Sequence, residues 1–142
     1  MSMEDELRCE RALGHFYRYL DDRDYARMLA LFHLEGIWLR QGETLSSHEK
    51  VLHAMERRSP TMVTRHVVSN AIARATTPDR MEVSAYLLFV RHETAAKDGV
   101  TQQPLLGLYT CTAEFWKIDG EWLIARLDAG KPAVNVTLDE KR

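Results

Sequence analysis

The sequence has little of what would assign it to a specialised class of protein. Its only cysteines, Cys9 and Cys111, have no Cys-x-x-Cys spacing, so we expect reduced structural thiols and no disulfide scaffold or redox site. No apolar run approaches the roughly 20 residues of a membrane span. The acidic N-terminus resembles neither a signal peptide nor a transit peptide. These absences predict a cytoplasmic protein with no membrane partner.

An excess of charge of one sign is also absent. Lys and Arg number 19 against 21 Asp and Glu, and a net charge of −2 provides no positive field for a nucleic acid. The six histidines form no HxH or HExxH pair, so the sequence predicts no metal site. Because the GxSxG, GxGxxG and Walker motifs are missing as well, we expect no cofactor.

What is present is an ordinary globular composition. The 142 residues are 45% hydrophobic and 28% charged, which fits a single domain over residues 1–142. The expected structural core extends over about residues 7–128. We expect the tail over residues 131–142 to be mobile.

The N-terminal part of the chain has helical periodicity. Apolar residues recur every three or four positions from Met3 to Leu20, and again from Tyr25 to Phe32, where Asp24 is the expected N-cap. These patterns predict one long and one short helix. A brief β-rich stretch from Ile37 to Arg40 follows, and Gly42 ends it.

A third helix is expected next. The stretch Ser46-Ser47-His48-Glu49 has the S-x-x-E form of a capping box, in which Ser46 is the cap. Arg57 and Arg58 complement the C-terminal dipole of this helix before Ser59-Pro60 ends it. Its expected inward residues are Val51, Leu52 and Met55.

After Pro60 the hydrophobic period changes to two and the composition turns to Val, Ile, Thr and aromatic residues, which is typical of strands. Asp119-Gly120 predicts a two-residue hairpin turn, and residues 94–104 predict a long polar loop. The expected strands are Met62 to Ala75, Arg80 to His92, Leu105 to Ile118, and Trp122 to about Leu127. Helices followed by antiparallel strands predict an α+β fold with the helices on one face of a curved sheet.

Asp21 is a candidate for acid or base chemistry. It follows Tyr17 by four residues and Leu13 by eight, so its carboxylate is expected on the apolar face of the first helix, toward the core. A carboxylate in that position can take part in proton transfer. The alternative is a solvated residue where the helix frays.

His66 is the second candidate. Strand alternation places it with Thr64, Val68, Asn70 and Ile72 on one largely apolar face. Imidazole exchanges protons near neutral pH, and a carboxylate partner would fix its tautomer. A histidine that is merely satisfied within the core is the alternative.

Three other side chains are weaker candidates. His92 closes its strand with the same parity as Tyr86 and Leu88, so it is also a candidate to point inward, and an exposed place in the hairpin stem is the alternative. Trp38 and Tyr109 supply aromatic surface that would line a pocket or fill the core.

The order of these elements resembles the SnoaL-like families of the nuclear transport factor 2 superfamily. The resemblance covers roughly Leu7 to Asp128 and rests on the stretches YLDDRDYARMLALF, SSHEKVLHAM, TRHVVSN and FWKIDGEWLIARL. It implies a cystatin-like cone, in which three N-terminal helices pack on a curved antiparallel sheet around a deep pocket.

Within the superfamily, these motifs are similar to those of the scytalone dehydratase and hexachlorocyclohexane dehydrochlorinase group, which removes a proton from carbon with an aspartate and a histidine. The resemblance matches these two to Asp21 and His66, and places His92 near a second histidine of scytalone dehydratase. Phe16 stands where the dehydrochlorinase has a lysine and ketosteroid isomerase a tyrosine, and Leu20 where scytalone dehydratase has a tyrosine. These departures do not support dehalogenation, they argue against the chemistry of ketosteroid isomerase, and they leave the substrate open.

Two hypotheses about function follow from these residues and this resemblance. The first is a cofactor-independent lyase or isomerase acting on a small hydrophobic or ring-containing molecule, and the second is a non-catalytic ligand-binding or subunit-assembly module of the same fold.

We also expect self-association as a dimer or trimer through the outer face of the sheet, at positions such as Leu106 and Leu108. The candidate site residues are Asp21, His66 and His92 for catalysis, and Asn70, Trp38 and Tyr109 for substrate binding.

Overall fold

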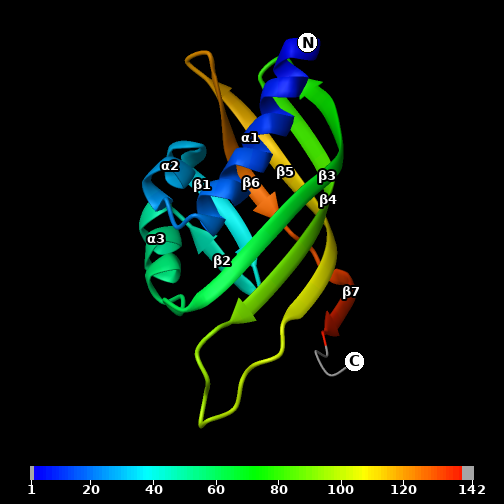
Figure 1. The fold of residues 1–142 in the computed structure, drawn as a ribbon. Coiled ribbons are helices and arrows are strands. Elements are labelled where there is room, and N and C mark those ends of the chain that lie inside the picture. The colour runs from blue at the N-terminus through cyan, green and yellow to red at the C-terminus, as the bar shows by residue number, and fades with distance from the viewer. Residues whose placement is uncertain (1, 139–142) are drawn as a thin grey trace.

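The computed structural model describes residues 2–138 of the chain. Within this range there are three helices and seven strands (Figure 1). The helices are α1 (Met3–Asp21), α2 (Tyr25–Ala30) and α3 (His48–Glu56). The strands are β1 (Phe32–Arg40), β2 (Glu43–Ser46), β3 (Met62–Thr77), β4 (Arg80–Glu93), β5 (Leu105–Ile118), β6 (Glu121–Asp128) and β7 (Pro132–Thr137). All three helices precede the first long strand, but β1 and β2 lie between α2 and α3.

The strands form one curved sheet in the order β2-β1-β6-β5-β4-β3, and β7 also pairs with β5. Every pairing is antiparallel except that of β1 with β6, which runs parallel from Phe32 opposite Ile124 to Leu39 opposite Asp128. The sheet is therefore mixed, and the expectation of a purely antiparallel sheet is wrong at this pair. Composition identifies a strand, but it does not identify a neighbour that comes much later in the chain.

The helices cover the concave side of the sheet. Figure 1 shows α1 lying across the curved strands, with α2 and α3 beside β1 and β2. The apolar stripe of α1, which includes Leu13 and Phe16, is buried against the inner faces of the strands. Their buried partners in the core cluster include Met81, Val83, Phe115, Ile124 and Leu127. None of the helices within residues 2–138 is both long and apolar enough to cross a membrane.

The start of α2 agrees with the sequence, whereas that of α3 is shifted by one residue. The Asp24 carboxylate accepts a hydrogen bond from the backbone N–H of Arg27 and caps α2. At α3 the cap is Ser47, and the expected cap, Ser46, instead ends β2. The S-x-x-E spacing fits Ser46 and not Ser47, which has Lys50 three residues later, but Ser46 is paired with Ile37 in the sheet, so the helix begins one residue further on.

The inward face of α3 also differs from expectation at one position. Val51 and Met55 are buried as expected, but Leu52 is 37% exposed. Ala54 occupies the third inward position. Because successive helical residues are rotated by about 100°, a residue directly after Val51 does not share its face.

A bulge in β3 changes which side chains face the core. The register between β3 and β4 shifts between Ser69 and Ile72, and Asn70 has a left-handed backbone with φ of 53°. Beyond this point Ala71 packs against the core, whereas Ile72 is 71% exposed. The expectation that Asn70 and Ile72 share the face of His66 is therefore wrong, because the extra residue of a bulge reverses the alternation.

The C-terminal segment is more structured than expected. Residues 132–137 form β7, which pairs antiparallel with β5 from Leu105 opposite Thr137 to Leu108 opposite Val134. The sequence analysis did not predict this strand, the mobility of the tail stays a prediction, and residues 139–142 lie outside the described residues. The hairpin at Asp119-Gly120 is confirmed, with φ of 50° and 82° at its two central residues.

The bulge yields a prediction about Asn70. Asn70→Gly should keep or raise stability, because glycine adopts a positive φ without a Cβ clash. Asn70→Val should lower the free energy of unfolding by about 1–2 kcal/mol. Urea unfolding followed by circular dichroism measures both, and Ser69→Val, at the exposed neighbour with ordinary backbone, is the control. Equal stability of the glycine and valine variants would contradict the left-handed backbone conformation of Asn70.

Candidate active site

A cavity of about 470 Å³ lies between the helices and the inner face of the sheet. Its wall combines aromatic side chains, among them Tyr17, Trp38 and Tyr109, with polar side chains that include Thr64 and His66. The elements that supply these residues are α1, β1, β3 and β5. The cavity has the size of a small-molecule site and the mixed lining that such sites use to orient a ligand.

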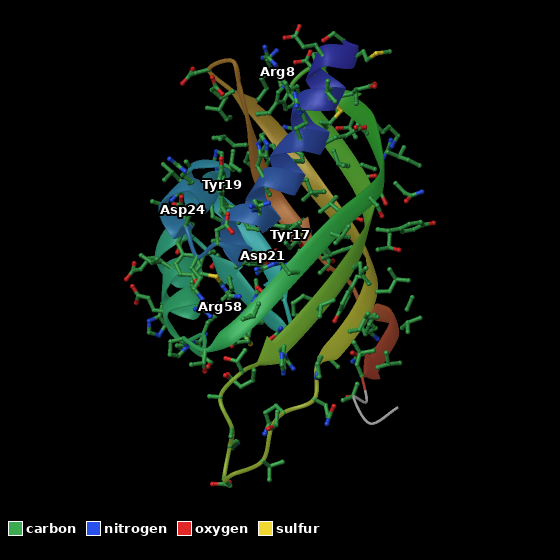
Figure 2. All side chains as sticks on the ribbon, viewed as in Figure 1. Arg8, Tyr17, Tyr19, Asp21, Asp24 and Arg58 are labelled. Atoms are coloured by element: carbon green, nitrogen blue, oxygen red, sulfur yellow. The ribbon has the colours of Figure 1, made fainter. Side chains whose placement is uncertain are left out.

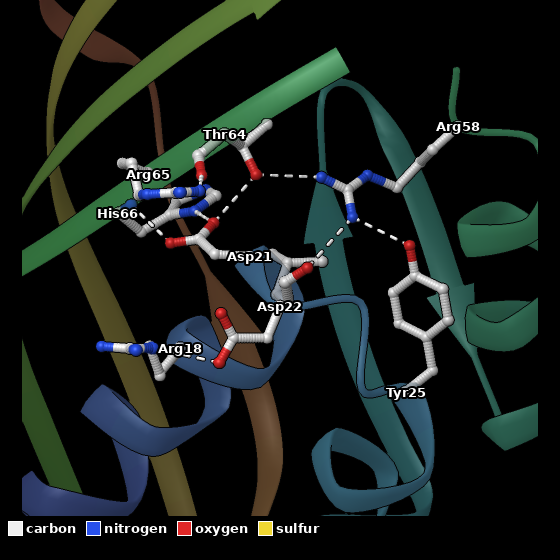
Figure 3. Close-up of polar contacts among 9 residues, drawn as sticks. Arg18, Asp21, Asp22, Tyr25, Arg58, Thr64, Arg65 and His66 are labelled. Atoms are coloured by element: carbon white, nitrogen blue, oxygen red, sulfur yellow. Dashed lines mark hydrogen bonds and ion pairs between the residues drawn. The ribbon is translucent and has the colours of Figure 1, made fainter. Parts of the chain in front are cut away.

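The Asp21 carboxylate at the end of α1 joins the helix to β3 beside this cavity (Figure 3). Its Oδ1 accepts hydrogen bonds from Nδ1 of His66 at 2.6 Å and from Oγ1 of Thr64 at 2.9 Å. Its Oδ2 accepts a third from the backbone N–H of His66 at 2.8 Å. The side chain is only 4% exposed, so these three donors replace the water that a carboxylate would otherwise bind.

The His66 ring is held from both faces. Tyr17 stacks on it with ring centroids 4.8 Å apart, and Phe89 stacks on it at 4.7 Å. The side chain of His66 is 10% exposed and lines the cavity. With stacking on two faces and a carboxylate at one edge, the imidazole has one orientation available.

The hydrogen bond to Asp21 determines the tautomer of His66. An ionised carboxylate can only accept, so Nδ1 of His66 must carry a proton. In the neutral ring this leaves Nε2 as the basic nitrogen, free to take a proton from a molecule in the cavity. An imidazole oriented by a buried carboxylate is the arrangement that general base catalysis uses.

Behind Asp21, a chain of hydrogen bonds leads to α3 and α2. Arg58 donates to Oγ1 of Thr64 at 3.0 Å, to the carbonyl of Leu20 at 3.1 Å and to the hydroxyl of Tyr25 at 2.9 Å. Figure 2 shows Asp21, at the end of α1, near Arg58, which follows α3 in the chain. Because the Thr64 hydroxyl accepts from Arg58, its own proton is directed at Asp21.

Two of the predicted substrate-binding residues line the cavity, and two other predicted site residues do not. Trp38 and Tyr109 are part of its wall. Asn70 is exposed at the bulge and is absent from the lining. His92 also lies outside the lining, because Phe89 and Arg91 of the same strand face the cavity and alternation turns His92 to the outer side. His92 and Asn70 are therefore not brought together with Asp21 and His66 at this cavity, and their roles in a site stay predictions.

Sequence reasoning missed Thr64 and Arg58. Thr64 was recognised only as sharing the face of His66, and Arg58 was assigned to the dipole of α3, whose C-cap is Arg57. Alternation was the available signal for Thr64, since it lies two residues before His66 in β3. Nothing in the local sequence indicates that Arg58 turns inward, because its partners belong to α1, α2 and β3.

Both cysteines are buried, Cys9 in α1 and Cys111 in β5. Burial raises the pKa of Cys9 to about 12 and that of Cys111 to about 11, so both remain protonated thiols at neutral pH. No group of three or more His, Cys, Asp or Glu side chains in this range is arranged to hold a metal ion.

Comparison with known proteins gives one family and a set of similar folds. The sequence profile of the SnoaL-like domain family matches residues 1–128. No curated protein matches the sequence. Three solved structures that resemble the chain are a cystatin-like protein of unknown function from Nostoc punctiforme, a protein of Novosphingobium aromaticivorans provisionally named a scytalone dehydratase, and a hexachlorocyclohexane dehydrochlorinase of Novosphingobium barchaimii.

These three structures have TM-scores of 0.72, 0.78 and 0.77 and sequence identities of 21%, 15% and 19%, in the same order. The alignments cover 90%, 98% and 98% of this chain, and 91%, 91% and 96% of the other chains. Similarity at such identities establishes the cystatin-like fold, and chemistry has to be argued from the residues of the site.

The hydrogen bonds of Thr64 yield a prediction about stability. Thr64→Val keeps the shape of the side chain but leaves Asp21 without one donor and Arg58 without one acceptor. We expect the free energy of unfolding to fall by about 1–3 kcal/mol. Thr110→Val, at an exposed position of β5, should change it by less than about 0.5 kcal/mol. Urea unfolding of both variants checks this, and equal effects would contradict a role for the hydroxyl.

The tautomer of His66 can be observed directly. Nitrogen-15 NMR of the neutral ring should find the proton on Nδ1, since Asp21 requires a donor there. In Asp21→Asn the side-chain amide can donate as well as accept, so both tautomers should become populated. The exposed His15 provides an internal control in the same spectra. A proton on Nε2 of His66 in the unaltered protein would contradict the geometry described here.

Proposed function

Because the chain belongs to the SnoaL-like domain family, we propose that it is a cofactor-independent lyase or isomerase that removes a proton from carbon in the cavity described above. The observation that supports this most directly is the 2.6 Å hydrogen bond between Asp21 and His66 at the cavity wall. Similar folds include a dehydrochlorinase and a provisionally named dehydratase, and both names denote elimination reactions.

In the proposed mechanism His66 is the general base. Its Nε2 takes a proton from a carbon of the substrate, and the electron pair of the broken C–H bond forms a carbon–carbon double bond. In an elimination the leaving group departs with its bonding pair, and in an isomerisation His66 returns the proton to another carbon. Asp21 stabilises the imidazolium that forms and keeps the ring in place.

Trp38 and Tyr109 are proposed to position the substrate. Both line the cavity, and Trp38 is also packed edge-on against Phe16 with ring centroids 5.2 Å apart. Rigid aromatic walls suit a ring-containing molecule, which they contact over a large area at little cost in side-chain entropy. Phe16 and Leu20 are apolar at positions where related enzymes have polar side chains. The proposed proton transfer therefore depends on Asp21 and His66.

We also propose that the outer face of the sheet joins two or more copies of the chain. Apolar side chains gather there on neighbouring strands, including the exposed Val67, Tyr86 and Leu108. Leu106 on β5 is half-buried, and β7 pairs beside it. An apolar face of this kind is typical of an interface between subunits.

The proposed function can be tested by isotope exchange. A panel of ring ketones and hydroxylated ring ketones is incubated with the protein in D₂O, and deuterium uptake or loss of water is followed by NMR. For any compound that reacts, Asp21→Asn and His66→Gln should lower the rate by about 10²–10⁴-fold while the fold persists. His15→Gln, an exposed histidine of α1, should leave the rate unchanged.

Undiminished turnover by Asp21→Asn would refute the mechanism. If the unaltered protein binds members of the panel but converts none, the ligand-binding module is the better description, because binding alone does not require a buried carboxylate paired with a histidine. Circular dichroism of each variant separates loss of chemistry from loss of folding.

A further inference from the structure

The cavity is rich in positive charge, which the overall composition does not suggest. Four arginines contribute to its lining, and Glu43 is the only acidic side chain in that lining. The arginines are Arg40, Arg57, Arg58 and Arg91. A cavity for a purely hydrophobic molecule has no need of guanidinium groups, which are costly to remove from water without an anionic partner.

Two of the four arginines already have partners. Arg58 donates its hydrogen bonds to Leu20, Tyr25 and Thr64, as described above. Arg57 pairs with Glu43 at 3.4 Å, and both of these side chains are about half exposed. Arg57 would have to give up its contact with Glu43 to bind a ligand. Arg58 is held in place by its three acceptors, and only its buried Nε has no hydrogen-bond partner among residues 2–138.

The other two, Arg40 and Arg91, have no such partners. Within residues 2–138 no side-chain hydrogen bond or ion pair involves either guanidinium, although both residues are half-buried in the cavity wall. Arg40 lies over the Trp38 ring at 5.5 Å. Burial, together with repulsion from Arg58, lowers the pKa of Arg40, so its positive charge would be stabilised by an anion.

The strand register brings Arg91 close to the His66 ring. His66 is paired with Phe89 and Thr64 with Arg91, and all four side chains line the cavity. A diagonal pair such as His66 and Arg91 has its Cα atoms about 7–8 Å apart. One small molecule can therefore reach both the imidazole and the guanidinium. Arg40 approaches the cavity from β1, two residues beyond Trp38 on the same strand face.

We propose that the substrate carries a carboxylate, which Arg91 and Arg40 bind while the remainder of the molecule lies over His66. This proposal rests on the proposed function and narrows its substrate class to ring-containing carboxylic acids. The planar fork of a guanidinium matches the two oxygens of a carboxylate. Trp38, Phe89 and Tyr109 provide the apolar surface for the ring.

The test compares matched acids and amides as probes. Benzoate and 3-phenylpropionate are titrated against benzamide and 3-phenylpropionamide, and binding to the full chain is followed by NMR. The acids should bind about tenfold more tightly or better, since a charge-assisted hydrogen bond is lost in the amide. Raised salt should weaken binding of the acids and leave binding of the amides unchanged.

Arginine variants then locate the anion. Arg91→Gln and Arg40→Gln should each weaken binding of the acids by about tenfold without affecting the amides. Arg74→Gln, on an exposed part of β3 outside the cavity lining, is the matched control. If a glutamine variant does not fold, Arg91→Lys or Arg40→Lys keeps the charge but loses the bidentate geometry, and should weaken binding of the acids to a smaller extent.

The failure of this proposal is distinguishable from the failure of the proposed function. Asp21→Asn and His66→Gln should retain the preference for acids, because they remove the base and leave the two arginines. If the acids bind no better than the amides, including the case in which neither binds, the carboxylate proposal is overturned. If the preference survives both glutamine variants, the anion is bound elsewhere and the assignment is overturned as well.

Discussion

The buried carboxylate of Asp21 is the contact on which the geometry of the site depends. It accepts three hydrogen bonds, and all three donors belong to Thr64 and His66 of β3. A desolvated carboxylate that lost a donor would destabilise the fold, so α1 and β3 are held at one separation and one register. The backbone N–H of His66 is one of the donors, which means that the strand itself is fixed, and with it every side chain on the same face.

The same requirement for partners extends to the ends of two helices. Arg58, just beyond α3, supplies the Thr64 hydroxyl with a donor and also binds the carbonyl of Leu20 in the last turn of α1. That carbonyl also accepts a hydrogen bond from the backbone N–H of Arg23 at 3.2 Å. Arg58 thus adds a second donor at the end of α1 and completes the polar chain behind Asp21. The helices, the strand and the candidate base form one connected network, and its parts cannot move independently.

The parts of this site that local periodicity determines could be predicted, and those that depend on distant partners could not. The spacing of Asp21 from Tyr17, and the alternation that places His66 with Thr64, both describe single elements, and both agree with the structure. Asn70 was misplaced because a bulge, which needs a left-handed residue and a partner strand, reverses the alternation after Ser69.

Similar reasons explain the other differences between the predicted and the observed fold and site. His92 belongs to a strand whose other parity, that of Phe89 and Arg91, faces the cavity, and the sequence alone does not say which parity is inward when both are apolar. The parallel pairing of β1 with β6 and the inward turn of Arg58 each join segments far apart in the chain. Alternation could also have predicted that Arg40 and Arg91 face the cavity, because they share strand faces with Trp38 and Phe89. On both strands a buried residue of the cavity wall precedes the arginine by two or four positions, Trp38 before Arg40 and Leu87 before Arg91, so the alternation that lines the cavity with apolar side chains also places positive charge in it.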